Sequence, residues 1–287
     1  IEDSFFPDDS SDFWDFYTIG SGLELDTVQG ALTSSHEAIL FASWEETLSS
    51  GDRARVISSR QKFASAWLQA ASNSKLLPNN TFVTAARLRL GYSLDHRPSS
   101  GDPFVSLSDK SHAPILKNLR HKEIAKNIAS WCIRAGAERA ETEPEHLWTV
   151  DNKHPDIDVQ LGQKQFLVDV AVVHITAPSY CIKAQRPFGG SEEMVKTKMD
   201  RFCDMAAQLD AAVCPAVLES FGAVTQPLID LFKAIANHSQ QDPYCLWSWN
   251  EIYFGLVLET SLLLQIGNVK VLQRKRDVNI ATRCVVH

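Results

Sequence analysis

The sequence lacks the marks of a disulfide scaffold, a membrane protein or a secreted protein. Its six cysteines are scattered, with no Cys-x-x-Cys pair, so a disulfide framework is not expected. The longest apolar candidate for a membrane span, residues 254–266, contains Glu259 and is too short. No basic stretch followed by an apolar one, the pattern of a secretory signal, stands at the beginning. We therefore expect a protein that is neither secreted nor inserted in a membrane.

Lysine and arginine are absent from residues 1–51, which hold eleven of the 35 acidic residues. The formal net charge is −7, yet residues 52–287 contain 28 basic and 24 acidic side chains. Residues 1–51 are therefore interpreted as an acidic, aromatic-containing arm or linker. Two alternatives stay open: a plain linker, or a segment that binds a protein partner or masks a basic nucleic-acid site.

Hydrophobic periodicity divides the remaining chain into a helical region, 52–113, and an α/β region, 114–287. The predicted helices cover residues 34–48, 61–71, 81–90, 117–135, 192–209 and 251–266. The predicted strands cover residues 146–150, 156–161, 166–173 and 212–218, with a hairpin turn at Leu161-Gly162-Gln163. From residue 117 to 218 the order is helix, three strands, helix, strand, which is the core order of the PD-(D/E)XK restriction-like nucleases.

Two aspartates stand where this order can bring them together. Asp156 lies in HPDIDV at the start of one predicted strand, and Asp169 lies in FLVDVAVVH on the next. A charge within an apolar strand is costly unless it is paired or has a function. Asp169 is thus either a salt-bridged core residue or a ligand. Mg²⁺ is commonly held by one or two carboxylates, and phosphodiester hydrolysis at neutral pH uses such a metal. The pair predicts a site for Mg²⁺ or Mn²⁺.

A lysine is expected beside such a pair, but Ala171 occupies the position two residues after Asp169. The helix 192–209 can supply a replacement. At ~100° per residue, Lys198 falls ~60° from Val195, at the edge of the buried face, and Lys196 falls ~100° away on the other side. Lys198 is therefore predicted to point toward the sheet, where it would orient water or stabilise phosphate charge.

These motifs resemble the restriction-like PD-(D/E)XK endonuclease region of non-LTR retrotransposon polyproteins, which follows the reverse transcriptase. The resemblance covers roughly residues 53–273 and suggests a domesticated derivative. It rests on HAPILKNLRHKEIAKNIASWCIRAGAERAETEP, HPDIDVQLGQKQFLVDVAVVHITAPSY and KTKMDRFCDMAAQLDAAVCPAVLESFGA. It implies an α/β fold with a restriction-endonuclease-like α-β-β-β-α-β core, a mixed sheet flanked by helices, and an N-terminal helical region.

The resemblance also implies roles for individual residues. Asp156 and Asp169 correspond to the metal ligands, Lys198 to the catalytic lysine with Lys196 as the alternative, and Glu143 to a third metal-binding or orienting carboxylate. The residues expected to contact the phosphate backbone are Arg120, His121, Lys183, Arg186, Lys196 and Arg201.

The chain departs from the family at two places. The family's zinc knuckle falls on residues 95–112, which keep His96 and His112 but contain no cysteine, so no zinc is expected. Phe202 stands where such families often have a tyrosine.

Two functions follow as hypotheses. The first is a Mg²⁺-dependent endonuclease that nicks DNA, in the nucleus or the cytoplasm, with RNA as the weaker substrate choice. The second is a catalytically inactive nuclease-fold scaffold that binds nucleic acid or a protein partner. The lost zinc ligands and Phe202 favour the second hypothesis, whereas the acid pair and Lys198 favour the first.

Overall fold

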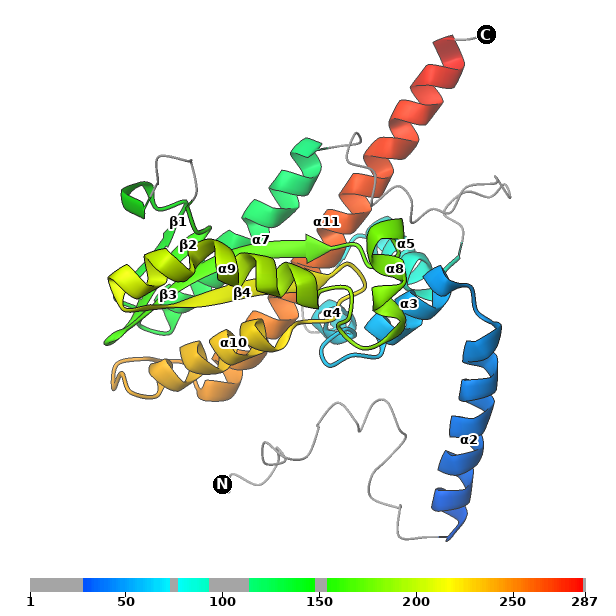
Figure 1. The fold of residues 1–287 in the computed structure, drawn as a ribbon, viewed down its shortest axis with the longest axis horizontal. Helices are drawn as coiled ribbons and strands as arrows, with labels where there is room; N and C mark the ends of the chain where they lie inside the picture. Colours follow the sequence, from blue (N-terminus) through cyan, green and yellow to red (C-terminus); the bar gives the residue numbers. More distant parts are fainter. Residues whose placement is uncertain (1–27, 73–76, 93–113, 148–153, 286–287) are drawn as a thin grey trace.

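The computed structural model of the chain describes residues 28–72, 77–92, 114–147 and 154–285. In this part of the chain a four-stranded sheet is flanked by helices (Figure 1). The strand order is β1-β2-β3-β4, with β1–β2 and β2–β3 antiparallel and β3–β4 parallel. The predicted mixed α/β class is confirmed at this level.

The elements around the sheet follow the predicted order of helix, three strands, helix and strand. They are α7 (Pro114–Arg134), β1 (Arg139–Thr142), β2 (Ile157–Leu161), β3 (Lys164–Val173), α9 (Glu192–Leu209) and β4 (Ala211–Glu219). Three short pieces lie between them: η1 (Glu145–Leu147), α8 (Pro178–Cys181) and η2 (Lys183–Gln185).

The first predicted strand was wrong. It was expected at 146–150, but β1 is Arg139–Thr142 and the 3₁₀ turn η1 covers residues 145–147; residues 148–150 lie outside the described part. Gly136, with φ of 85°, ends α7, and the chain then pairs at once with β2, Arg139 opposite Gln160. Pro144 lacks the N–H that would continue this ladder.

Six further helices complete the described chain: α2 (Val28–Thr47), α3 (Ser50–Ser59), α4 (Ala66–Ser72), α5 (Asn79–Leu90), α10 (Gln226–Ser239) and α11 (Trp249–Val285). Helices α3 and α10 were not predicted, and the predicted end of α11 at residue 266 lies too early. Helix α2 projects from the body (Figure 1), and residues 1–27 of the expected acidic arm lie outside the described part.

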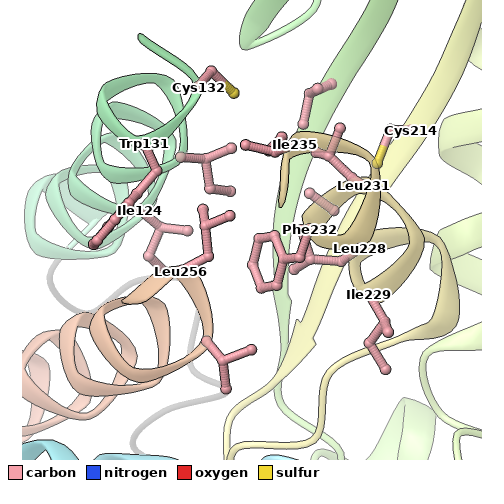
Figure 2. Packing of buried hydrophobic residues seen from close by; sticks show 14 of the residues in the cluster. Ile124, Trp131, Cys132, Cys214, Leu228, Ile229, Leu231, Phe232, Ile235 and Leu256 are labelled. Atoms are coloured by element: carbon pink, nitrogen blue, oxygen red, sulfur yellow. The ribbon is translucent and has the colours of Figure 1, made fainter. Parts of the chain in front are cut away.

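The main core lies between one face of the sheet and helices α7, α10 and α11 (Figure 2). Alternate strand residues, including Ile157, Val168 and Val170, point into it and are almost fully buried. Their neighbours Asp158, Leu167 and Asp169 belong to the opposite face by the period of two in a strand, and Leu167 packs there with Ala206 of α9. One face of the sheet therefore packs on α7, α10 and α11, and Asp158 and Asp169 lie on the face toward α9.

Helix α11 contains a longer apolar stretch than predicted from the sequence. Residues Trp249–Gln273 are long and apolar enough to cross a membrane by length and composition, the one such helix in the described residues. The expectation that no window reaches this length was wrong. However, 67% of that window is buried within the protein, and Ile252, Leu256 and Leu264 belong to the main core. Core packing accounts for this composition.

Candidate active site

The strand register brings three acidic residues into one row across the sheet. Thr142 pairs with Ile157 on one side of β2, and Ile157 pairs with Val168 on the other. One residue further along, the same register places Glu143 opposite Asp156 and Asp156 opposite Asp169. The Glu143 N–H donates to the Asp156 carbonyl at 2.8 Å, as this register requires. Directly opposite residues have Cβ atoms about 5 Å apart, so the two aspartates meet because of the hairpin.

Asp156 is held from two sides. His121 on α7 has its Nε2 2.9 Å from Asp156 Oδ1, and the Val170 backbone N–H donates to Oδ2 at 2.6 Å. The side chain of Asp156 is 17% exposed, so the carboxylate remains open to a ligand. His121 thus contacts a candidate metal ligand, and its predicted contact with phosphate stays a prediction.

Asp169 is buried against α9, its side chain only 4% exposed. Lys198 Nζ lies 2.8 Å from Asp169 Oδ2, so Lys198 points toward the sheet as its helical position predicts. Lys196, two residues earlier, is exposed. The structure thus brings Asp156, Asp169 and Lys198 together, and their chemical roles stay predictions.

The two carboxyl groups have opposite pKa shifts. Burial, together with the hydrogen bond and the charge of Asp156, raises the pKa of Asp169 to about 6 against the opposing effect of Lys198. Burial also acts to raise the pKa of Asp156, but hydrogen bonds with His121, Asp169 and Val170 outweigh it, so its pKa lies below the ordinary value. Like charges this close share a proton at acidic pH.

This donor set suits a hard divalent cation. No three His, Cys, Asp or Glu side chains in the described residues are grouped closely enough to hold a metal by themselves. Mg²⁺ commonly binds through one or two carboxylates and completes its shell with water and substrate phosphate. Asp156 and Asp169 meet that requirement, and a cation between them would replace the shared proton.

Glu143 reaches the site by its backbone rather than by its side chain. Its carboxylate pairs with Lys122 of α7 at 2.8 Å, and this hydrogen bond holds the pKa of Glu143 below its ordinary value. Its φ is 52°, a left-handed conformation that is strained for a non-glycine residue. A role for Glu143 as a third metal ligand therefore requires its side chain to leave Lys122.

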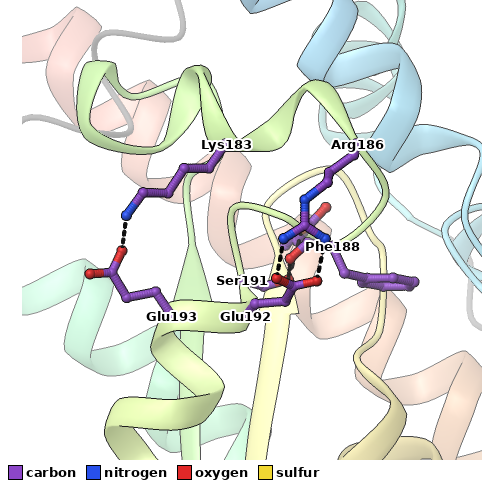
Figure 3. Close-up of polar contacts among 7 residues, drawn as sticks. Lys183, Arg186, Phe188, Ser191, Glu192 and Glu193 are labelled. Atoms are coloured by element: carbon purple, nitrogen blue, oxygen red, sulfur yellow. Dashed lines mark hydrogen bonds and ion pairs between the residues drawn. The ribbon is translucent and has the colours of Figure 1, made fainter.

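Two of the expected phosphate-binding residues are paired with acids. Lys183 pairs with Glu193, and Arg186 makes a two-pronged contact with Glu192 (Figure 3). All four side chains are at least half exposed, so these pairs contribute little to stability.

Arg201 and Arg120, two more of the expected phosphate contacts, differ in accessibility. Arg201 on α9 is exposed and lies over the Phe202 ring at 5.1 Å. Arg120 is partly buried and donates to Asn268 of α11. His96 and His112 of the expected zinc-knuckle segment lie outside the described residues.

A further acid beside the site, Asp158, was not predicted from the sequence. Asp158 is fully buried, and its Oδ2 lies 2.8 Å from Arg139 Nη2 and 3.2 Å from His146 Nε2. Gln165 donates to its Oδ1 at 2.8 Å. The alternation of residues in HPDIDV could have placed Asp158 on the face of Asp156. This cluster fixes β1 and η1 on the sheet edge next to the aspartate pair.

No protein-family model matches the chain, and no curated protein matches it either.

Proposed function

We propose that the protein is a metal-dependent endonuclease with a restriction-like core, and that it hydrolyses phosphodiester bonds of DNA. The observation that carries the proposal is the convergence of Asp156, Asp169 and Lys198 from three elements on one point of the sheet. The helix–strand–strand–strand–helix–strand order and the mixed sheet support the restriction-like description.

In this proposal the side chains have separate tasks. Mg²⁺, when bound, stabilises negative charge on the phosphate and acidifies water. Asp156 and Asp169 would hold it, with Asp156 oriented by His121. Lys198 would orient the attacking water or stabilise the charge that develops as the P–O bond breaks. Its side chain is only 15% exposed, and a sheltered charge acts more strongly than one in bulk water.

The test is nicking of supercoiled plasmid in the presence of Mg²⁺ or Mn²⁺. Wild type is compared with Asp156→Asn and Asp169→Asn, and with Asp200→Asn as a control at an exposed acid on α9. We expect nicking by wild type and by Asp200→Asn, and none by the other two variants.

The scaffold hypothesis makes a different prediction in the same experiment. A scaffold binds DNA equally well in all four proteins and nicks in none. That outcome would replace the enzyme proposal. Nicking that persists in Asp156→Asn and Asp169→Asn would show that another site is responsible.

A further inference from the structure

A cleft of about 640 Å³ lies between the β2–β3 hairpin and α10. Small-molecule sites in proteins have volumes of roughly 300–1,000 Å³. Lys164, which lines the cleft, and Asp169 are five positions apart in β3, or ~17 Å at ~3.3 Å per residue. Because strand residues alternate, Lys164 and Phe166 lie on the face of the sheet opposite Asp169. The cleft is therefore separate from the acid pair.

One side of α10 forms a wall of the cleft. The residues of α10 that line it recur at helical spacing and so share one side of the helix. They are Asp230, Lys233, Ala234, Asn237 and His238. The opposite side of α10, with Leu228, Phe232 and Ile235, is buried in the main core. The packing that buries the apolar side of α10 thus presents its charged and amide groups to the cleft.

Hydrogen bonds between elements hold the cleft open at the hairpin. The Gly162 N–H in the turn donates to Glu138 Oε2 at 2.8 Å, which joins the hairpin to the segment after α7. His238 Nε2 lies 3.1 Å from the Gly136 carbonyl, which joins the end of α10 to the same segment. The cleft is therefore part of the fold itself.

The floor of the cleft is apolar and includes an aromatic ring. Leu161 is buried, and Phe166 and Ala234 are partly buried against the main core. Because Phe166 also lines the cleft, part of its side chain is accessible to a ligand there. A planar aromatic ligand can stack on such a ring, as nucleobases do on the aromatic residues of proteins.

The polar groups near the hairpin suit an anion. Lys164 and Lys233 supply two positive charges to the cleft. The Trp249 indole N–H donates to Asn237 Oδ1 at 2.7 Å, so Asn237 offers a ligand only the N–H donors of its amide. Lysine and amide N–H groups together bind phosphate oxygens well.

Asp230 suits a different part of the ligand. Its Oδ1 accepts from Gln226 Nε2 at 2.7 Å, and a carboxylate has about four acceptor positions in all. The positions that remain suit a ligand edge with adjacent N–H donors. Among the nucleobases, guanine presents such an edge through its ring N–H and its amino group.

The order of these groups along the cleft matches one ligand. Asp230 and Asn237 are seven positions apart on α10, or ~10 Å at 1.5 Å per residue, which is about the length of a nucleoside monophosphate. A Cβ built on Gly162 would lie 3.9 Å from His238 Cε1, so the hairpin with Lys164 lies near the Asn237 end of the helix. The acid and the hairpin lysine therefore stand at opposite ends of the cleft.

We propose that this cleft binds a guanine nucleotide, whose base stacks on Phe166, whose N–H edge contacts Asp230 and whose phosphate lies at Lys164. The nucleotide is either free or the terminal residue of a nucleic-acid chain. The proposal does not rest on the nuclease function, because the cleft lies on the other face of the sheet from Asp169.

The first arm of the test compares ligands by calorimetric titration in EDTA, so that neither a bound metal nor cleavage contributes. We expect wild type to bind GMP more tightly than AMP or guanosine. Asp230→Asn should weaken GMP binding and leave AMP binding no weaker than in wild type. If Asp230→Asn binds both nucleotides more tightly, the carboxylate only repels phosphate, and the assignment of guanine is wrong.

Two further variants test the phosphate and the base separately. Lys164→Met should weaken GMP binding by roughly two- to fivefold and leave guanosine binding unchanged. Lys126→Met, at an exposed lysine of α7, is the matched control and should bind GMP as wild type does. Phe166→Leu should weaken both GMP and guanosine roughly tenfold.

Thermal melting shows whether each variant is folded. Phe166 packs against the core, so its replacement can destabilise the protein; Lys164 is exposed, and its variant tests the proposal even if Phe166→Leu does not fold. Absence of GMP binding by wild type, or equal GMP affinity in wild type, Lys164→Met and Asp230→Asn, would overturn the proposal.

The second arm identifies the source of the nucleotide. A 5′-phosphorylated trinucleotide that begins with guanine is titrated under the same conditions as GMP. Affinity equal to or higher than that of GMP indicates the end of a nucleic-acid chain, and lower affinity indicates a free nucleotide. Either result requires the same losses in Asp230→Asn and Lys164→Met. Failure of the nuclease proposal is seen separately, in the plasmid assay.

Discussion

Lys198 Nζ lies 2.8 Å from Asp169 Oδ2, and both side chains are sheltered from solvent. The contact joins the middle of β3 to the second turn of α9. Lys198 supplies a cation beside Asp169 that the strand lacks, because Ala171 occupies the position two residues after Asp169. Helix α9 thus completes a site that the hairpin alone leaves without a positive charge.

Replacement of Lys198 should reduce plasmid nicking far more than replacement of its neighbour. Lys198→Met removes a sheltered charge beside the acid pair, and we expect a rate loss of roughly 10²–10³. Lys196→Met removes an exposed lysine from the same helix and should change the rate only slightly. Nicking rates at saturating Mn²⁺ measure both effects. Equal losses in the two variants would argue against an individual role for Lys198.

His121→Ala should weaken metal binding without unfolding the protein. The imidazole orients Asp156 through a 2.9 Å contact, and loss of such a supporting group commonly costs 10–100-fold in metal affinity, as an order of magnitude. Calorimetric titration with Mn²⁺ measures the change. His238→Ala on α10, where Nε2 lies near the Gly136 carbonyl, is the control. Wild-type affinity in His121→Ala would contradict the orienting role.

Without divalent metal, stability should fall as pH rises from about 4 to about 6. The pKa of Asp169 is raised to about 6, so in this window the folded state keeps a proton that the unfolded state has lost. The depressed pKa of Asp156 acts in the opposite direction and only at lower pH, where protonation removes its stabilising contribution. Urea unfolding at pH 4.5 and 7 in EDTA, compared between wild type and Asp169→Asn, isolates the contribution of Asp169. If the free energy of unfolding depends on pH equally in wild type and Asp169→Asn, Asp169 does not cause the dependence.

Gly255→Ala should destabilise the contact between α11 and α7. A Cβ on Gly255 would come within 2.2 Å of the Trp131 ring, and overpacking of this kind costs roughly 1–3 kcal/mol. Gly51→Ala in α3 has no atom closer than 4.0 Å to the new Cβ, and it should stabilise the helix by roughly 0.5–1 kcal/mol. Chemical denaturation measures both. If Gly255→Ala leaves the free energy of unfolding unchanged, α7 and α11 can move apart at little cost.

The pairing of Asp156 with Asp169 could be predicted from local sequence. A turn at Leu161-Gly162-Gln163 makes Leu161 pair with Lys164, and the same register puts Asp156 opposite Asp169. Short-range turn chemistry sets this register. Helix periodicity in turn gave the bounds of α9 and the direction of Lys198. The strand at 139–142 was missed because it is only four residues long and its burial pattern does not alternate.

Other features were decided by long-range packing alone. His121 reaches Asp156 because α7 packs on the sheet, and Arg120 reaches Asn268 because α7 crosses α11 closely at Gly255 and Gly267. No local pattern specifies that crossing, since it depends on residues more than a hundred positions apart. The sequence by itself therefore determined the hairpin, its acid pair and the face of the lysine. The docking of α7 against the sheet and α11 decided that His121 supports Asp156 and that Arg120 contacts Asn268.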